Sequence, residues 1–157
     1  MEILILAVVT LPLLTALFLK VANRFLNELL TNFITINAAL LSVAVSFFMF
    51  GYLLLDKFKP IKFELFEWYP SPQIIFEFYL DGLSGVMMIL ISGLSLVIQL
   101  FSTSYMSKDE KYTKYFEYFN FFVFSMLLLV LSGNFLVMFF GWELVGLSSY
   151  LLISFRY

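Results

Sequence analysis

Long apolar stretches, separated by short polar segments, dominate the pattern of hydrophobic and polar positions along this chain. An α-helix needs about 20 apolar residues to cross the hydrocarbon core of a bilayer, and several stretches approach that length. The stretch 119–155 carries one charge and is about twice as long as one span requires, so the turn-like sequence SGN at 132–134 is taken to divide it. The pattern predicts an all-α membrane protein with about five transmembrane helices, at about residues 3–19, 33–55, 83–101, 115–131 and 135–155.

The first apolar stretch is interpreted as a span and not as a leader. Glu2 stands where a signal peptide would carry basic residues, and no small-residue cleavage site follows. Pro12 lies inside this span and predicts a kink. Lys20, Arg24 and Glu28 are expected in a short polar connection to the second span.

Residues 56–81 form the one extended polar region of the chain. The sequence IKFEL at 61–65 alternates strictly between apolar and other side chains, which indicates a strand. The sequence PSPQ at 70–73 is typical of a turn, and residues 74–80 supply a returning strand. We therefore expect a small extramembrane β-hairpin, lying on the membrane surface between the second and third spans.

One face of the third predicted span is polar. Ser92, Ser95, Gln99 and Ser102 follow the spacing i, i+3, i+7 and i+10, which places them on one side of a helix. Two interpretations stay open for this face: hydrogen bonding between helices, or the wall of a hydrated path. Asp81 directly precedes the span and is typical of a helix N-cap, with a second, functional role on the same polar path as the alternative.

The composition limits the chemistry that this chain can perform. Hydrophobic residues make up 62% of it and charged residues 13%, so lipid is the expected solvent. The absence of cysteine and histidine argues against disulfides, iron–sulfur clusters, and the usual haem and metal sites. A net charge of -2 without a basic stripe argues against nucleic acid as a partner. We expect no cofactor, metal or redox centre in this chain, and any proton chemistry must use carboxylates, lysines and water.

Basic residues are unevenly distributed between the two sides that five spans define. Lys57, Lys59 and Lys62 fall on the side of the N-terminus and the hairpin. The positive-inside rule assigns the other, more basic side to the cytoplasm or the mitochondrial matrix, with the N-terminus outside. The basic residues on that other side are Lys20, Arg24, Lys108, Lys111, Lys114 and Arg156, several of them in a charged loop over residues 107–117.

Glu143 is the foremost candidate for chemistry. It lies near the middle of the fifth predicted span, where a carboxylate costs at least a few kcal/mol. Desolvation favours its protonated form, so a nearby charge can switch it, as a proton-loading site requires. The alternative is a structural glutamate that is hydrogen-bonded across a helix interface. Gly141, Gly146 and Ser148 flank it and either allow close helix packing or leave room for water.

Three segments of the sequence resemble subunit 5 of respiratory complex I, a family related to Mrp-type antiporters. They are YLDGLS at 79–84, FEYFN at 116–120 and FFGWELVGLSSYLLI at 139–153. The chain departs from the usual family pattern at Leu144, where glycine is common, and at Arg156, where an aromatic residue is usual.

The resemblance implies a proton-translocating subunit of NADH:ubiquinone reductase whose key glutamate is Glu143. The family's essential lysines and histidines correspond to positions beyond Tyr157, so the chain would be the N-terminal part of one antiporter-like domain, with the remainder missing or on another chain. Expected partners are other membrane-arm subunits, a chain that supplies the later helices, and lipid. NADH, FMN, iron–sulfur clusters and ubiquinone would then reside in other subunits. The expected location is the mitochondrial inner membrane or, alternatively, a bacterial plasma membrane.

Two other functions stay open at this point. The same module could belong to an Mrp-type cation/proton antiporter, which has no link to electron transfer. It could also be a non-transporting scaffold fragment of the complex, although the presence of Glu143 in the span argues against decay of the site.

Overall fold

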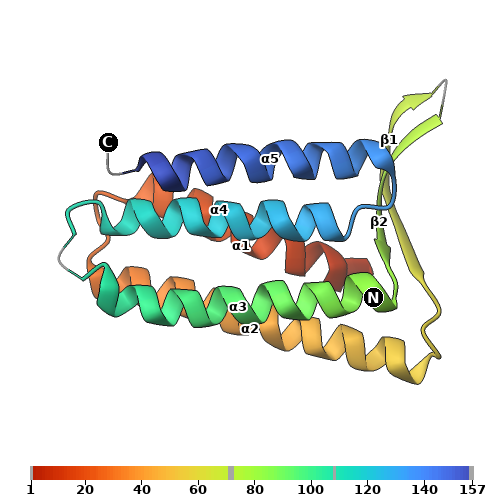
Figure 1. Ribbon diagram of the computed structural model, residues 1–157, viewed down its shortest axis with the longest axis horizontal. Coiled ribbons are helices and arrows are strands. Elements are labelled where there is room, and N and C mark those ends of the chain that lie inside the picture. Colours follow the sequence, from red (N-terminus) through yellow and green to blue (C-terminus); the bar gives the residue numbers. More distant parts are fainter. Residues whose placement is uncertain (1, 71–72, 108, 156–157) are drawn as a thin grey trace.

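Five helices and one β-hairpin make up the computed structural model, which describes residues 2–70, 73–107 and 109–155, with the backbone alone for 68–70 and 73–74. The helices run side by side in alternating directions, and the hairpin stands across one end of the bundle (Figure 1). The predicted fold class, an all-α membrane protein with a small hairpin between its second and third helices, is confirmed. The elements are α1 (Glu2–Ala22), α2 (Glu28–Leu55), β1 (Ile61–Pro70), β2 (Gln73–Leu80), α3 (Gly82–Tyr105), α4 (Tyr112–Val130) and α5 (Phe135–Ser154).

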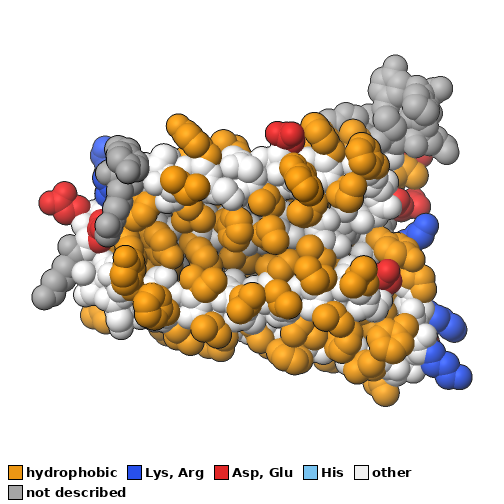
Figure 2. All heavy atoms as spheres, viewed as in Figure 1, with side chains coloured by type: hydrophobic (Ala, Val, Ile, Leu, Met, Phe, Trp, Pro, Cys, Tyr) orange, Lys and Arg blue, Asp and Glu red, His pale blue; other side chains and the backbone are white. Residues whose placement is uncertain are grey.

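The lengths and surfaces of the helices suit a bilayer. Within the described residues α1, α2, α3 and α5 are each long and apolar enough to cross a membrane. α4 has 19 residues, includes Lys114 and Glu117, and packs against α1, α3 and α5. Hydrophobic side chains cover the visible face of the bundle, and charged side chains lie mainly at its two ends (Figure 2). The protein is therefore a multi-pass membrane protein in which α4 is the most central helix.

The interior of the bundle contains many small polar side chains. α2 buries Thr31, Thr35, Ser42 and Ser46 along one stripe. Lipid tails are as apolar as leucine, so helices in a bilayer gain stability from close packing of small residues and from hydrogen bonds, not from hiding apolar surface from water. Thr31 Oγ1 lies 3.2 Å from a hydroxyl of α4, that of Thr113, and these two helices are joined by that bond.

Several helix ends differ from the prediction. α1 continues through Pro12 and includes Lys20, and α2 begins at Glu28, so the polar connection between them is shorter than expected. The reason is an N-cap at Asn27, whose side chain accepts a hydrogen bond of 2.9 Å from the amide of Leu30. Hydropathy misplaces these ends because charged residues occupy helical turns that extend beyond the apolar stretch.

Hydropathy also misplaces the helix ends at the charged connection between α3 and α4. α3 extends to Tyr105, and α4 begins at Tyr112, inside the segment predicted to be a charged loop. Lys108, Arg156 and the predicted turn residues Ser71 and Pro72 lie outside the described residues.

The hairpin is hydrogen-bonded to the bundle and does not only rest on a membrane surface. β1 and β2 pair antiparallel, and the free edge of β2 pairs with the turn between α4 and α5. The amide of Tyr79 donates to the Leu131 carbonyl at 2.8 Å, and the amide of Gly133 donates to the Glu77 carbonyl at 2.9 Å. Phe78 is also buried in the main hydrophobic core. The hairpin and the α4–α5 turn therefore hold one another in place at what we call the hairpin end of the bundle.

The cap of α3 fixes where the hairpin gives way to the helix. The Asp81 carboxylate accepts a hydrogen bond of 2.8 Å from the amide of Ser84, and the Ser84 hydroxyl accepts one of 2.8 Å from the amide of Asp81. This reciprocal pair satisfies two backbone donors at the start of α3 and confirms the predicted N-cap. The bond from the Ser84 amide lowers the pKa of Asp81 below its usual value, because it favours the ionised carboxylate.

Gly141 sets the distance between α4 and α5. A Cβ atom at this position would lie 2.7 Å from the Leu129 Cα, which is backbone and cannot move aside. We expect Gly141→Ala to push α5 away from α4 and to cost about 1–3 kcal/mol, as overpacking typically does. Gly146→Ala is the matched control on the same helix, because nothing lies within 4 Å of the place that its added methyl group would occupy. The stability of both variants is measured by the thermal midpoint of the detergent-solubilised protein. Equal midpoints for the two variants would contradict the close contact between Gly141 and Leu129.

Because the pKa of Asp81 is lowered in the folded protein, its ionised carboxylate contributes to the stability of the fold in a pH-dependent way. This contribution is fully present above the ordinary carboxyl pKa of about 3.9, and it is lost as the pH falls through the lower pKa of the folded protein. Asp81→Asn keeps a cap acceptor but removes the charge, so it should be less stable than the parent by up to about 1 kcal/mol at neutral pH. The thermal midpoints of the parent protein and of Asp81→Asn, measured from neutral to acidic pH, should converge below pH ~4. A constant difference across that range would show that the charge of Asp81 plays no part.

Candidate functional site

The position of Glu143 along α5 is set by the cap of that helix. Asn134 precedes α5, and its side chain accepts a hydrogen bond of 3.0 Å from the amide of Val137. The same carboxamide donates to the Ile75 carbonyl of β2 at 2.5 Å. α5 therefore starts at a defined level of the hairpin end, and Glu143 lies about 12 Å further along the axis at 1.5 Å per residue. This depth corresponds to the middle of the helix, as the sequence predicted.

Glu143 points away from the rest of the bundle. α5 buries Val137, Gly141 and Ser148, which form the face in contact with α4. Glu143 is two residues beyond Gly141, about 200° around the helix, so its side chain is directed to the opposite face. It is exposed there, beside the exposed ring of Trp142. Glu143 is the one charged residue of that helix.

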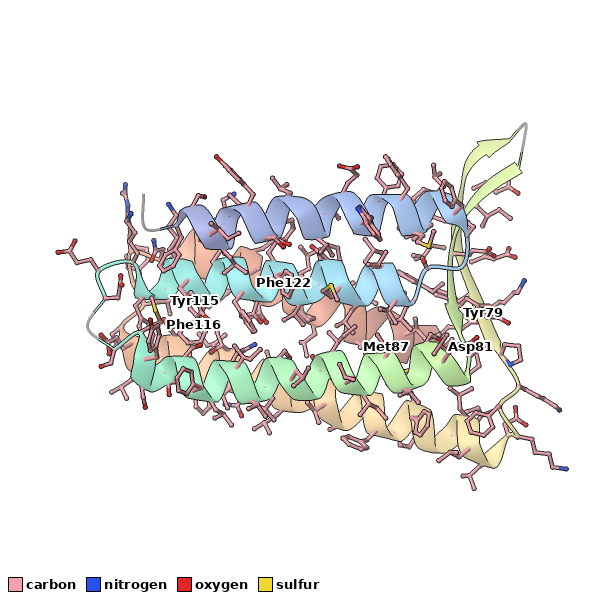
Figure 3. The ribbon with its side chains drawn as sticks, in the orientation of Figure 1. Tyr79, Asp81, Met87, Tyr115, Phe116 and Phe122 are labelled. Atoms are coloured by element: carbon pink, nitrogen blue, oxygen red, sulfur yellow. The ribbon has the colours of Figure 1, made fainter. Side chains whose placement is uncertain are left out.

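Two hollows on this side of the bundle bring Glu143 and Asp81 into the same region. One, of about 320 Å³, is lined by Glu143 with four apolar side chains, among them Met138 and Trp142. The other, of about 450 Å³, contains Asp81 and Tyr79 and shares Met138 and Trp142 with the first. Figure 3 shows Tyr79 and Asp81 at the hairpin end of α3. The two carboxylates thus line neighbouring hollows that share two apolar side chains, an arrangement that sequence spacing alone does not reveal.

The polar face of α3 is turned into the protein, as predicted. Ser92, Ser95, Gln99 and Ser102 are all buried. Ser95 donates to the Ser92 carbonyl at 2.7 Å, and the Ser102 hydroxyl lies 2.9 Å from the hydroxyl of Tyr115 on α4. Among the described residues, the buried Gln99 Oε1 has no hydrogen-bond partner, so it retains the capacity to accept a bond from a water molecule.

The structure does not bring this α3 face together with Glu143. α3 packs mainly on α2 and α4, whereas α5 packs on α4. Ser148 is buried on the α4 side of α5 and donates to the Val145 carbonyl at 3.0 Å. It therefore lies away from Glu143, although the two are close in sequence.

A third group of ionisable residues is not evident from the sequence. Lys20 and Lys114, which hydropathy assigns to connections, belong to α1 and α4 and line a crevice with the half-buried Glu117. The crevice lies between α1, α4 and α5 at the end of the bundle opposite the hairpin, which we call the basic end. The spacing i, i+3 of Lys114 and Glu117 is the one signal that could have placed both on a single helix face.

Comparison with known proteins identifies the family. A family model described as NADH-ubiquinone oxidoreductase (complex I), chain 5 N-terminus matches residues 68–116. NADH-quinone oxidoreductase subunit L of Buchnera aphidicola from Schizaphis graminum is 38% identical over 152 residues, which cover 96% of this chain and 25% of that protein. NADH-ubiquinone oxidoreductase chain 5 of Allomyces macrogynus is 36% identical over 153 residues, with coverages of 96% and 24%.

A solved structure shares the fold. It is that of the membrane-bound sulfane sulfur reductase, an archaeal respiratory membrane complex, with a TM-score of 0.81 and 19% identity over 96% of this chain and 30% of the other. The present chain spans about a quarter of the length of the relatives named above. By its family match and its relatives, the chain belongs to the complex I chain 5 family, also called subunit L, and corresponds to the N-terminal part of that family.

Proposed function

We propose that this chain forms part of the proton-translocating membrane arm of a respiratory NADH:quinone oxidoreductase and that Glu143 is its proton-loading group. The observation that carries the proposal is the exposed carboxylate at mid-helix on the apolar outer face of α5. Lipid does not tolerate an ionised carboxylate at this depth, so Glu143 must be protonated, paired or hydrated in the working protein. In each of these three states, the protonation of Glu143 depends on the groups that contact the outer face of α5.

The proton chemistry follows from desolvation and one approaching charge. In lipid, a carboxyl group flanked by apolar side chains would hold its proton, because hydrocarbon does not solvate the ionised form. An ammonium group that moves close stabilises the carboxylate and releases that proton. The lysine would come from a helix outside residues 1–157 or from a neighbouring subunit, and it would contact the face of α5 opposite to Gly141. The close contact of Gly141 with α4 holds the carboxylate towards that partner.

Asp81 and the polar face of α3 would extend the proton route. Asp81 would act from the neighbouring hollow, which shares Met138 and Trp142 with that of Glu143. The α3 face with Ser92, Ser95 and Gln99, whose Oε1 has no partner among the described residues, would line a second, hydrated path that is separate from Glu143 and from Ser148 of α5.

The location and partners of the chain are part of the same proposal. NADH, FMN, iron–sulfur clusters and ubiquinone would be bound by other subunits, and the later helices of the domain would complete the site at Glu143. The basic end, with Lys20, Lys111 and Lys114, would face the matrix or the cytoplasm of a mitochondrial inner or bacterial plasma membrane. The names of the relatives favour an NADH:quinone oxidoreductase over a stand-alone antiporter or a scaffold fragment.

The orientation can be tested by labelling. A single cysteine introduced at Glu110, which is exposed between α3 and α4, should react with a membrane-impermeant maleimide only from the matrix or cytoplasmic side. A cysteine at Lys59, which is exposed on the connection from α2 to the hairpin, should react only from the other side. The chain offers a clean background because it contains no native cysteine. Labelling of Glu110→Cys from the outer side would reverse the proposed topology.

The role of Glu143 can be tested by removing its titration. Glu143→Gln keeps size and hydrogen bonding, so the complex should assemble while proton pumping falls by roughly a hundred-fold or more, as loss of a proton-transfer group typically causes. Glu143→Asp should retain part of the activity, because the charge stays and only its reach shortens. Glu110→Gln is the matched control, an exposed glutamate outside the helices. Proton uptake and NADH oxidation in reconstituted vesicles give the ratio of protons to electrons, and a parental ratio for Glu143→Gln would make Glu143 structural.

A further inference from the structure

The crevice at the basic end has a charged part and an apolar part. Its volume is about 580 Å³, and its lining comes from α1, α4 and α5. Among the described residues, its lining has no member in common with that of the two hollows that contain Glu143 and Asp81. Its shape and chemistry are not used by the proton-loading function proposed above.

Two ammonium groups from different helices define the charged part. Lys20 lies in the last turn of α1 and Lys114 in the first turn of α4, and both side chains are exposed. The Lys114 Nζ lies 5.6 Å from the centroid of the Tyr118 ring, which itself lines the crevice, so the ammonium is held at the crevice wall. Both lysines lie near enough to Glu117 to act on its charge. Among the described lining residues, two lysines against one glutamate leave a net charge of at least +1.

The apolar part continues from the lysines towards the middle of the bundle. Leu13 lies two turns before Lys20 on α1, and Phe121 lies two turns beyond Lys114 on α4, each about 10 Å further along its helix at 1.5 Å per residue. Leu147 and Leu151 of α5 close the third wall. The crevice therefore begins at the helix ends, where lipid headgroups lie, and extends into the depth of the acyl chains.

We infer that this crevice binds an anionic phospholipid. Its phosphate would lie between the ammonium groups of Lys20 and Lys114, with the carboxamide of Asn23 as a further donor. One acyl chain would follow the apolar wall past Leu17 and Leu147, both about half exposed in this chain. Charge complementarity selects an anionic over a zwitterionic headgroup, because the choline or ethanolamine cation of the latter would face two lysines. Each lysine near a membrane surface contributes roughly five-fold to the binding of an anionic lipid.

Two other occupants of this crevice, inorganic phosphate and water, would give different results in a lipid-labelling experiment. Free inorganic phosphate would use the lysines but not the apolar wall. A water-filled entry for protons would use Lys20, Lys114 and Glu117 but would not retain lipid. The largely apolar lining favours the phospholipid over both.

Photo-crosslinking of the whole purified complex tests the inference. The probe is phosphatidylglycerol with a photoreactive group on one acyl chain, supplied in phosphatidylcholine nanodiscs, and labelled peptides are located by mass spectrometry. We expect labelling of α1, α4 and α5 peptides that line the crevice, suppressed by unlabelled phosphatidylglycerol and not by inorganic phosphate. Lys20→Gln and Lys114→Gln should each lower it roughly five-fold. Lys57→Gln with Lys59→Gln, at the hairpin end, is the matched control and should leave this labelling unchanged.

A second variant keeps the test independent of the lysines. Leu17→Trp fills the apolar wall at a half-exposed position of α1, and it should also reduce labelling while both lysines remain. Equal labelling by a phosphatidylcholine probe, competition by inorganic phosphate, or unchanged labelling in the lysine variants would each overturn the inference. Absence of labelling from the crevice in the parent complex would do so as well. Because Glu143→Gln pumping assays do not depend on this crevice, failure here leaves the proton-loading proposal standing.

Discussion

Backbone amides and carbonyls that cross hydrocarbon have no water to bond with, and most features of this molecule are consequences of that constraint. It requires helices in the apolar layer and leaves the strands to one end of the bundle. It also explains why small polar side chains are buried: the hydroxyls of Ser46 and Ser95 donate to carbonyls of their own helices, and those of Thr31 and Thr113 lie within bonding distance of each other. The exposed apolar side chains on the outside are then solvated by lipid and need no further cover.

α5 is the exception within this packing. It has a narrow buried face that Gly141 brings against α4, and the opposite face carries both aromatic rings and a carboxylate. A helix with a charge on its outer side is incomplete in lipid, whereas a helix with the same charge against further helices is not. The relatives are about four times as long as this chain, so they contain enough sequence to cover that face. In the function proposed above, this face is where a further helix would lie.

Local features of this structure could be predicted from the sequence, and features that depend on contacts between distant segments could not. The Asp81 cap and the hairpin follow from neighbouring residues, and the buried face of Ser92 and Gln99 follows from helical periodicity. The direction of Glu143 depends on which face of α5 meets α4, which only the contact at Gly141 reveals. The lysine crevice depends on the meeting of α1 and α4, and the prediction for Lys114 is wrong because hydropathy cannot distinguish a helical turn at headgroup level from a connection.

The bond between Asn134 and Ile75 joins residues 59 positions apart, and this separation has a consequence for biogenesis. A ribosome delivers the hairpin before α3 and α4, so β2 emerges with one edge unpaired and remains so while two further helices enter the membrane. An open strand edge is a template for pairing with another chain. The nascent protein is thus most prone to aggregate during this interval, which ends only when the turn after α4 reaches the same side of the bilayer. A longer connection between α3 and α4, at the opposite end of the bundle, would prolong that interval without changing the bonds between β2 and the α4–α5 turn.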